Sequence, residues 1–228
     1  MKNILELQNI NKIYGKEIKT QVLYDINLAF EEGSFNSIIG QSGSGKSTIL
    51  NIMGTLDKPT SGEIIIDGID VKTMSGNQLS MLRNNTIGFV FQFHYLLPEF
   101  TALENVLMPF EIKEGKVTKE ARERAAEYLA LVGLEKYKNN LATKMSGGQQ
   151  QRAAIARALM NNPKIILADE PTGNLDSDTT EKIYELLYNI NKKLGTTFVI
   201  ITHDRRIAEK TDRIVEIKDG RISIDIRK

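Results

Sequence analysis

The chain has 228 residues, of which 41% are hydrophobic and 26% are charged, and its formal net charge at pH 7 is +1. This composition is typical of a globular protein with a sizeable core, and a net charge so near zero provides no basic field for binding nucleic acid. The absence of cysteine excludes disulfides and cysteine-based zinc sites. No apolar run approaches the roughly 20 residues that span a bilayer, and polar residues interrupt the N-terminal segment, so we expect neither a membrane-spanning helix nor a signal peptide.

The first part of the chain consists of apolar runs separated by turn residues. Two early runs precede the turn at Glu31-Glu32-Gly33, and a later run ends at a glycine-rich segment that opens a helix. In chain order the pattern predicts strands at residues 4–10, 22–30 and 35–39, a helix at 46–53, and strands at 63–67 and 87–91.

The middle of the chain has helical spacing, with many charges between its apolar positions. It predicts helices at residues 101–113, 118–132 and 147–160, and Gly133 is suited to end the second of them.

The last third alternates between strands and helices. The predicted order is a strand at residues 165–168, a helix at 179–194, a strand at 197–202, a short helix, a strand at 213–217, a turn and a final strand. Such alternation indicates a parallel sheet covered by helices. We therefore expect one α/β domain over residues 1–228, with a core formed by both ends of the chain and a helical lobe inserted at about residues 95–160.

A glycine-rich segment between a predicted strand and a predicted helix matches the P-loop pattern. Its glycines allow successive N–H groups to point inward, and the helix N-terminus adds its positive end, so the segment forms a site for the β- and γ-phosphates of a nucleotide. Lys46 supplies a charge to those phosphates, and Ser47 offers its hydroxyl to Mg²⁺. A P-loop alone does not distinguish motors from kinases and GTPases. The predicted nucleotide contacts are Gly40, Gln41, Ser42, Gly43, Ser44, Gly45, Lys46, Ser47 and Thr48.

The apolar run at residues 165–168 ends in two acids, Asp169 and Glu170. Ligands of open α/β sheets lie beyond the carboxyl ends of the strands, so the two acids lie beside the P-loop if the two strands are neighbours. Asp169 fits a ligand of Mg²⁺, and Glu170 is placed where a base could orient the attacking water. The alternative is that one acid caps the turn that begins at Pro171.

Residues 145–149, Met-Ser-Gly-Gly-Gln, together with the P-loop and Asp169-Glu170, resemble the signature of the ATP-binding cassette (ABC) ATPases. The resemblance covers essentially the whole chain, with the motifs in the family's order. It implies an α/β fold with a RecA-like, mostly parallel P-loop NTPase core, an N-terminal antiparallel β part and an inserted α-helical lobe. Met145 stands where the family usually has leucine, which is a change between apolar residues of similar size.

The resemblance also assigns roles to single residues. Tyr14 resembles the aromatic residue that stacks on adenine, and Gln92 resembles the Q-loop glutamine, which contacts Mg²⁺ and the attacking water. Asn174-Leu175-Asp176 resembles the D-loop, and His203 resembles the switch histidine at the γ-phosphate. The alternatives are a packing role for Tyr14, a solvated Gln92 and a buried structural His203. With these roles the catalytic residues are Lys46, Gln92, Glu170 and His203, and the Mg²⁺ ligands are Ser47, Gln92 and Asp169.

Ser146-Gly147-Gly148 is a second glycine-rich helix start and hence a second anion site. In a head-to-tail dimer, this site of one copy can face the ATP that the P-loop of the other copy holds. The resemblance thus implies an ATP-dependent homodimer with two ATP molecules at its interface. The signature and D-loop contacts to nucleotide are Ser146, Gly147, Gly148, Gln149 and Asp176.

Residues 89–106 carry many large apolar side chains near the join of core and lobe. A pocket there could receive an amphipathic helix of a membrane permease, so we expect docking near Gln92–Phe100; the alternative is ordinary core of the helical lobe. Phe93-His94-Tyr95-Leu96-Leu97-Pro98 and the segments at residues 54–62 and 169–176 look like those of the lipoprotein-releasing (LolD-type) ATPases. That branch also contains ATPases of macrolide export, antimicrobial-peptide resistance and cell division.

The resemblance implies a peripheral ATPase on the cytoplasmic side of the inner membrane, which uses ATP and Mg²⁺ and drives a permease in lipoprotein release. Soluble ABC ATPases of DNA repair or translation carry long insertions or two fused cassettes, for which 228 residues leave no room, and we expect no nucleic-acid partner. A P-loop kinase would need an acceptor pocket and a mobile lid, and no segment demands either; a GTPase would differ in the choice of purine. The preference for adenine rests on the resemblance, because stacking on a tyrosine tolerates several bases.

Overall fold

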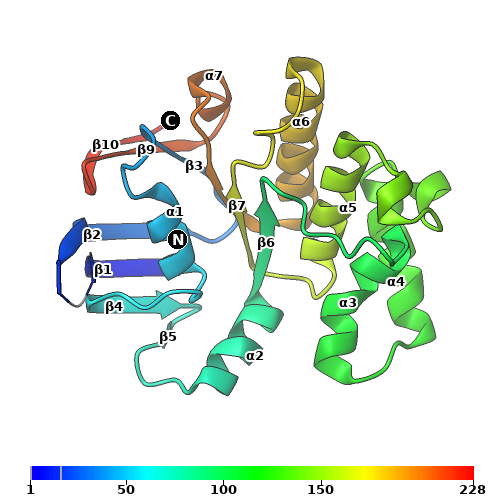
Figure 1. Cartoon of the computed structure of the whole chain (residues 1–228), viewed down its shortest axis with the longest axis horizontal. Coiled ribbons are helices and arrows are strands. Elements are labelled where there is room, and N and C mark those ends of the chain that lie inside the picture. The colour runs from blue at the N-terminus through cyan, green and yellow to red at the C-terminus, as the bar shows by residue number, and fades with distance from the viewer. Residues whose placement is uncertain (1, 16) are drawn as a thin grey trace.

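The computed structural model describes residues 2–15 and 17–228, and a mainly parallel six-stranded sheet forms its centre (Figure 1). The strand order is β10-β9-β3-β8-β7-β6, in which β9, β3, β8, β7 and β6 run parallel and β10 pairs antiparallel with β9. Strands β3 and β8 are buried along their whole length. The strands are β3 (Phe35–Ile39), β6 (Ile87–Phe91), β7 (Ile165–Asp169), β8 (Thr197–Ile201), β9 (Arg213–Lys218) and β10 (Arg221–Arg227).

A four-stranded antiparallel sheet of order β2-β1-β4-β5 packs beside the first sheet. Helix α1 (Lys46–Met53) lies between the two sheets, and its buried face belongs to a core that also includes Ile10 of the antiparallel sheet and Val199 of the parallel sheet. The helix that follows the glycine-rich loop is thereby fixed from both sides. The antiparallel strands are β1 (Asn3–Tyr14), β2 (Thr20–Glu31), β4 (Ser61–Ile66) and β5 (Ile69–Asp70).

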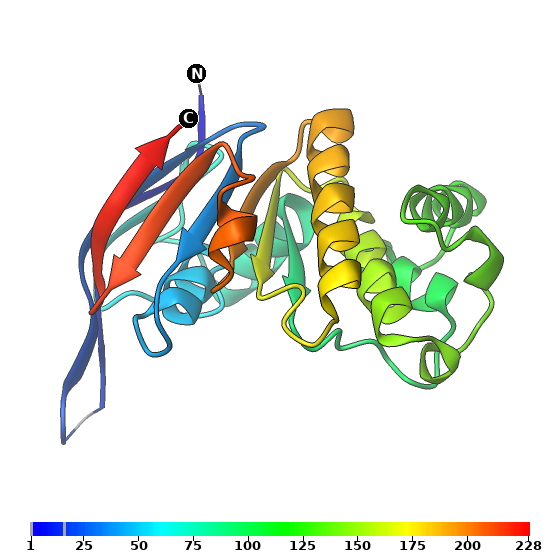
Figure 2. The same cartoon turned by 90° about the horizontal axis from the view of Figure 1, so that it is seen from above.

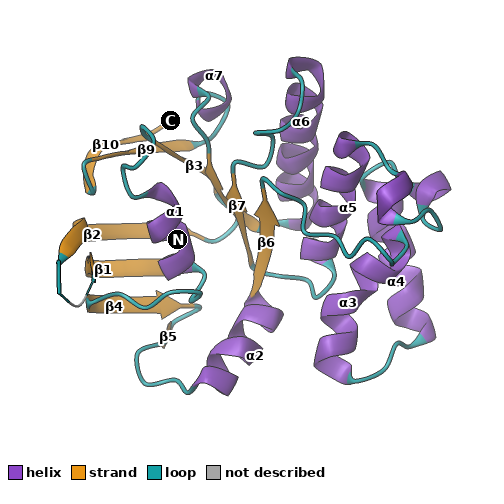
Figure 3. Cartoon of the chain, viewed as in Figure 1, coloured by secondary structure: helices purple, strands orange, loops and turns teal. Residues whose placement is uncertain are grey.

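The helices between β6 and β7 gather on one side of the parallel sheet, as Figures 1 and 3 show. Thr101 and Ser146 each form a capping box with the third residue of the helix that follows, which fixes where two of these helices begin. A second hydrophobic core joins them to the sheet and to α6, which runs along the sheet beside α5 (Figure 2). The remaining elements are α2 (Gly76–Thr86), α3 (Ala102–Glu114), α4 (Lys119–Leu131), the 3-10 turns η1 (Glu135–Tyr137) and η2 (Ala142–Lys144), α5 (Gly147–Leu159), α6 (Ser177–Leu194) and α7 (Arg205–Ala208).

The expected α/β class, mostly parallel core and N-terminal antiparallel part are confirmed. The main difference is α2, which the sequence pattern did not predict. Gly76 and the three asparagines among its residues are weak helix formers, and the helix is stabilised by the capping box at Ser75 and by burial of Leu79 and Leu82. Strands β1 and β2 are also longer than predicted, because irregular pairing at left-handed residues such as Asn9 and Asp25 interrupts the period-two pattern.

Candidate nucleotide site

The predicted phosphate and acid residues meet at one edge of the parallel sheet. Phe91, Asp169 and Ile201 lie level with one another in β6, β7 and β8, so the residues that follow them leave the sheet side by side. The glycine-rich loop leaves the same edge from β3. Strands β3 and β7 are not neighbours, which was the condition for placing the two acids beside the P-loop, since β8 lies between them. The site forms nevertheless because all four strands are parallel and end at this edge.

The loop at residues 40–45 curls as the P-loop pattern requires. Gly45 has φ of 103°, and a Cβ there would lie 2.8 Å from Leu23 Cδ2. A Cβ at Gly40 would lie 2.2 Å from the Ile217 carbonyl oxygen, so neither position has room for a side chain. Lys46 Nζ donates to the carbonyl oxygens of Gly40 and Gln41, at 2.8 Å in each case. The lysine charge is therefore held over its own loop, at the start of α1.

A cavity of about 470 Å³ opens above this edge of the sheet. It brings the loop together with residues that lie 46 to 157 positions away from Lys46 in sequence, namely Gln92, Asp169, Glu170 and His203. This is the grouping expected of a nucleotide site. The lining residues are Val22, Ser42, Gly43, Gly45, Lys46, Ser47, Thr48, Gln92, Asp169, Glu170, Ile201 and His203.

Glu170 and His203 are bonded to each other across the mouth of this cavity. His203 Nδ1 lies 2.8 Å from Glu170 Oε2, and the His203 side chain is 72% exposed. The alternative of a buried structural histidine is therefore wrong. Glu170 has a left-handed backbone with φ of 46°, which an L residue adopts at a cost of about 1–3 kcal/mol and which turns its carboxylate toward the cavity residues.

Asp169 provides the test of whether a cation fits here. Its Oδ1 is buried and has no hydrogen-bond partner, which is costly unless a ligand satisfies it. Burial raises the pKa of the Asp169 carboxyl, Glu170 adds to that rise, and the nearby Ser47 hydroxyl and Lys46 charge oppose it. In the described part of the chain no group of three or more acidic, histidine or cysteine side chains could hold a metal by itself. Mg²⁺ usually takes one or two protein oxygens together with phosphates and water, so Asp169 and Ser47 fit it.

Gln92, which follows β6, is paired with Asn174. Its Nε2 donates to Asn174 Oδ1 at 3.1 Å, and Asn174 Nδ2 donates to the Gln92 carbonyl oxygen at 3.3 Å. Gly173 allows this approach, because a Cβ there would lie 2.8 Å from Gln92 Nε2. The predicted alternative of a solvated glutamine does not hold for this side chain, which packs against Gly173.

The segment at residues 146–149 lies on a different surface. Ser146 Oγ accepts from the Gln149 amide at 3.3 Å, and Gln149 Oε1 accepts from the Ser146 amide at 2.9 Å, so both side chains cap α5. Asp176 caps α6 in the same way through Thr179. This second surface surrounds a cavity of about 600 Å³ that shares no lining residue with the first. Its lining residues are Gly133, Leu134, Tyr137, Ser146, Gly147, Gly148, Gln149, Arg152, Asn174, Leu175, Asp176 and Thr179.

Tyr14 does not line the first cavity, although it lies at its margin. Its hydroxyl is close enough to the Thr48 side chain to affect the tyrosine pKa, which burial and the bond to Asp57 raise. The residue is 41% exposed, and its hydroxyl donates to Asp57 Oδ2 at 2.6 Å. No local sequence pattern distinguished Asp57 and Gly173 from ordinary turn residues, and Asn174 was singled out only as part of the D-loop resemblance.

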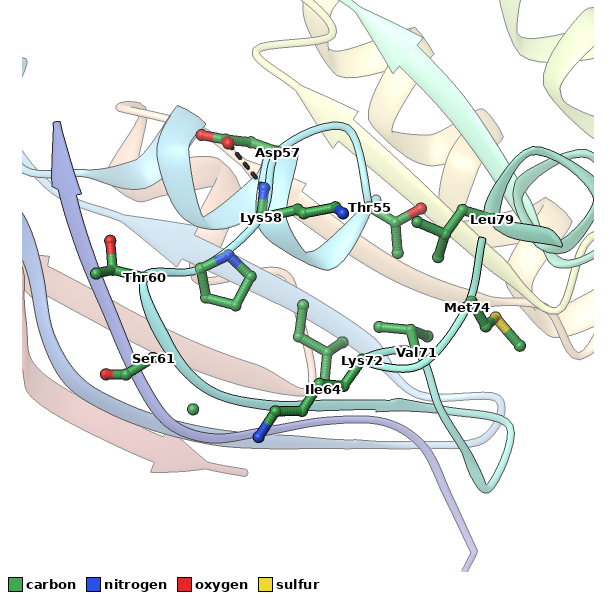
Figure 4. A pocket seen from close by; sticks show the side chains of 12 residues that line it. Thr55, Asp57, Lys58, Thr60, Ser61, Ile64, Val71, Lys72, Met74 and Leu79 are labelled. Atoms are coloured by element: carbon green, nitrogen blue, oxygen red, sulfur yellow. Dashed lines mark hydrogen bonds between the residues drawn. The ribbon is translucent and has the colours of Figure 1, made fainter. Parts of the chain in front are cut away.

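Further hollows lie outside this region, and two of them border the loop after α1 or helix α2. Figure 4 shows one of about 330 Å³ between the loop after α1 and β4, with Ile64, Val71 and Leu79 among its lining side chains. The other, of about 370 Å³, lies between α2, β6 and α3, and it is largely apolar, with Phe89 and Ile112 in its lining. Among the helices of the described residues, none is long and apolar enough to cross a membrane.

Comparison with known proteins places the chain among ATP-binding cassettes. A family model described as ABC transporter matches residues 23–173. The lipoprotein-releasing system ATP-binding protein LolD 1 of Rhodopseudomonas palustris is 49% identical over 225 residues, which cover 98% of this chain and 100% of that one. LolD of Bacteroides thetaiotaomicron is 50% identical over 222 residues, covering 97% and 100%.

Solved structures agree in fold. A dimeric, post-hydrolysis structure of the ATP-binding cassette MJ0796, bound to ADP and Pi, has a TM-score of 0.89 at 48% identity and covers 98% of both chains. The cbiO1 subunit of Clostridium perfringens, part of the transporter complex cbiONQ, also has a TM-score of 0.89, at 31% identity, covering 100% of this chain and 89% of that one.

Proposed function

The chain belongs to the ABC transporter family as an ATP-hydrolysing cassette, and we propose that it forms an ATP-dependent homodimer that drives a permease in lipoprotein release. The main support for the nucleotide chemistry is that one cavity brings the P-loop together with Gln92, Asp169, Glu170 and His203. The lipoprotein assignment rests on relatives of about half identity that are named for that system.

In this proposal the P-loop amides and Lys46 bind the β- and γ-phosphates, and Ser47, Gln92 and Asp169 would hold Mg²⁺. When bound, that ion would neutralise charge that develops on the phosphates. Lys46 must exchange its two bonds to loop carbonyls for bonds to phosphate, and these charge-assisted bonds are the stronger ones.

Glu170 orients a water for in-line attack on the γ-phosphorus. As the water oxygen bonds to phosphorus, the bond from phosphorus to the β–γ bridging oxygen breaks, ADP leaves, and the water proton passes toward Glu170. His203 holds one Glu170 oxygen at 2.8 Å, which leaves the other oxygen for the water. Its exposed ring is also free to move toward the γ-phosphate.

The second surface supports the dimer. Ser146, Gly148 and Asp176 line a cavity separate from the P-loop cavity, so one copy cannot place both around the same nucleotide. The start of α5 offers unpaired N–H groups and a positive helix end, which suit the γ-phosphate of an ATP bound by a second copy. The MJ0796 cassette, a dimer in its solved structures, provides the analogy. The part of this surface at Ser146–Gln149 belongs to the proposed helical subdomain at about residues 95–160 of a single ABC ATPase domain, and Asp176 adds to it from the segment after β7.

We assign the docking site of the permease to the apolar hollow between α2, β6 and α3 and to the adjoining segment Gln92–Phe100. Large apolar side chains stand exposed around it, among them Phe93, Tyr95 and Ile112. Arg157 donates to the carbonyl oxygens of His94 and Tyr95, which fixes the segment beside the hollow. Exposed apolar patches of this kind mark interaction surfaces. A chain docked there would sit peripherally on the cytoplasmic side of the inner membrane.

The test is to isolate the tagged chain from gently solubilised native membranes, with the Lys46→Ala and Ile112→Asp variants in parallel. We expect permeases with large extracytoplasmic domains and bound lipoprotein to accompany the wild type, and Ile112→Asp to lose them while keeping ATP binding. Recovery of a permease without lipoprotein, or with a drug or peptide substrate, would indicate instead that the chain is the ATPase of a sibling transport system. Recovery of no membrane protein would refute the docking assignment and leave the ATPase chemistry.

A further inference from the structure

Tyr14 is held by a carboxylate whose two oxygens are both engaged. Its hydroxyl donates to Asp57 Oδ2 at 2.6 Å, and Lys12 Nζ donates to Asp57 Oδ1 at 2.6 Å. Asp57 Oδ1 also accepts from the Lys58 amide at 2.7 Å, the bond drawn in Figure 4. Burial alone would raise the pKa of Asp57, but the bonds from Lys12 and Tyr14 lower it below its usual value, so the carboxylate is ionised at neutral pH.

Lys12 covers one face of the Tyr14 ring. The lysine is 8% exposed, its Nζ lies 4.5 Å from the ring centroid, and it also donates to the Lys58 carbonyl oxygen at 2.6 Å. A cation at this distance is attracted by the ring and fixes its plane. The exposed part of Tyr14 is therefore its edge and the opposite face, which is the surface a flat ligand could use.

The same loop ties the tyrosine to the helix that carries the P-loop. The Asp57 amide donates to the Asn51 carbonyl oxygen at 3.1 Å, in the second half of α1, whose first residue is Lys46. Thr60 Oγ1 accepts from the Ile13 amide at 2.9 Å, which joins the loop to the end of β1. The ring and the P-loop are thus fixed relative to each other through one short segment.

We propose that Asp57 and Lys12 are positioning residues for the nucleobase, which hold the Tyr14 ring in the orientation that a purine stacks upon. This inference rests on the proposed function and on the base-stacking role that the resemblance to the ABC ATPases gives to Tyr14. An exposed tyrosine side chain must lose rotational freedom when a base stacks on it, and a ring already fixed avoids that loss. The carboxylate charge matters to this role, because it pairs with Lys12 over the ring at 2.6 Å. An amide in its place would lose that charge and would have to reverse the hydrogen bond to the Tyr14 hydroxyl.

The test compares ATP, which has a base, with inorganic tripolyphosphate, which has none. Affinities of the full chain for both are measured by calorimetry without Mg²⁺, and kcat and KM for ATP are measured with Mg²⁺. Base stacking on an aromatic ring corresponds to about 5- to 100-fold in affinity, so Tyr14→Ala should weaken ATP within that range. Asp57→Asn and Lys12→Met should weaken ATP binding about three- to tenfold through lost preorganisation, raise KM in proportion and leave kcat and tripolyphosphate binding unchanged.

Asp67→Asn is the matched control, since Asp67 is likewise an aspartate bonded to two lysines, Lys2 and Lys164, at a turn distant from Tyr14 in sequence. It should leave both affinities unchanged. In the Tyr14→Ala background, Asp57→Asn should have no further effect on ATP affinity, because it acts through the ring.

The inference is overturned if Asp57→Asn weakens tripolyphosphate as much as ATP, if its effect persists without the tyrosine ring, or if only Tyr14→Ala matters. Unchanged ATP affinity in Tyr14→Ala would remove the base-stacking role together with the inference. The nucleotide site itself would fall only if Lys46→Ala also kept normal affinity for ATP and tripolyphosphate, so the two failures are distinguishable.

Discussion

Gly173→Ala isolates the pairing of Gln92 with Asn174 from the stability of the fold. Gly173 has no positive φ, so alanine suits its backbone. The added Cβ would lie 2.8 Å from Nε2 and 2.9 Å from Cδ of Gln92, closer than real Cβ contacts, and the glutamine side chain must therefore move. The clash is with the end of a flexible side chain, so the free energy of unfolding should change by less than about 1 kcal/mol.

The expected effect on turnover follows from the contacts that are lost. Moving the Gln92 side chain breaks its bond to Asn174 Oδ1, at 3.1 Å, which contributes about 0.5–1.5 kcal/mol. The bond from Asn174 Nδ2 to the Gln92 backbone carbonyl oxygen, at 3.3 Å, does not involve that side chain. A catalytic group displaced by about 1 Å can cost about 100-fold in rate. We therefore expect kcat to fall about 10- to 100-fold in Gly173→Ala, with less than a threefold change in ATP affinity, because the P-loop contacts are untouched.

The assay is steady-state ATP hydrolysis together with calorimetric ATP binding and a thermal melt. Gly76→Ala is the matched control, since it makes the same chemical change at a glycine whose Cβ would meet nothing within 4 Å. It should leave turnover and ATP binding within error, and its melt should show at most a small gain in stability, because alanine suits the first turn of α2. Wild-type kcat in Gly173→Ala would refute the role assigned to Gln92. Loss of activity that follows loss of the folded state would refute the geometric argument instead.

Three other perturbations test separate parts of the structure. Lys46→Ala removes the charge held over the P-loop and should reduce ATP binding to near the limit of calorimetric detection; retained tight binding would exclude the phosphate site. Glu170→Gln should keep ATP binding and lower turnover by about 10²–10⁴-fold, the usual range for a lost general base, and light scattering should detect a dimer with ATP but not without it. Bonds from Arg213 lower the pKa of Asp225 below its ordinary value of 3.8, so ionised Asp225 stabilises the fold above that pH. Asp225→Asn should therefore lower the free energy of unfolding by about 1 kcal/mol at pH 7, after allowance for solvent screening. In urea titrations this difference should vanish as pH falls from 3.8 through the lower folded pKa, and a difference that persisted there would have another cause.

Local sequence patterns were sufficient to predict those elements whose structure is determined by residues adjacent in the sequence. Residues 35–39 and 46–53 were predicted with the bounds that β3 and α1 have, because an apolar run, a glycine-rich turn and a helix start follow one another in sequence. Helix α2 was not predicted, since Gly76 and its polar neighbours favour a loop until Leu79 and Leu82 are buried. Strand order is likewise absent from local sequence, which is why β8 was not expected between β3 and β7.

The sequence likewise predicts some features of the site and not others. Asp169 could be selected because it ends an apolar strand, and His203 because of the resemblance to the ABC ATPases. Parallel strands bring both positions to one edge of the sheet. The contacts that orient these residues could not be predicted from the sequence. Tyr14 meets Asp57 across 43 positions and Gln92 meets Asn174 across 82, and a single sequence carries no signal for such pairs. Residues with roles were therefore easier to predict than the residues that orient them.

The phosphate cavity has the features of a site that a ligand completes. Asp169 Oδ1 is buried without a partner, so the chain alone bears the desolvation of that oxygen. Lys46 is bonded to neutral carbonyls of its own loop, although a lysine forms stronger bonds with anions. Ser44 Oγ is also buried and unpaired, inside the loop that the phosphates would contact. An anion accompanied by a hard cation satisfies all of these groups, because the anion bonds to Lys46 and Ser44 and the cation faces Asp169. An anion alone would face the unpaired Asp169 carboxylate. The geometry therefore favours a metal-bound polyphosphate over a free one.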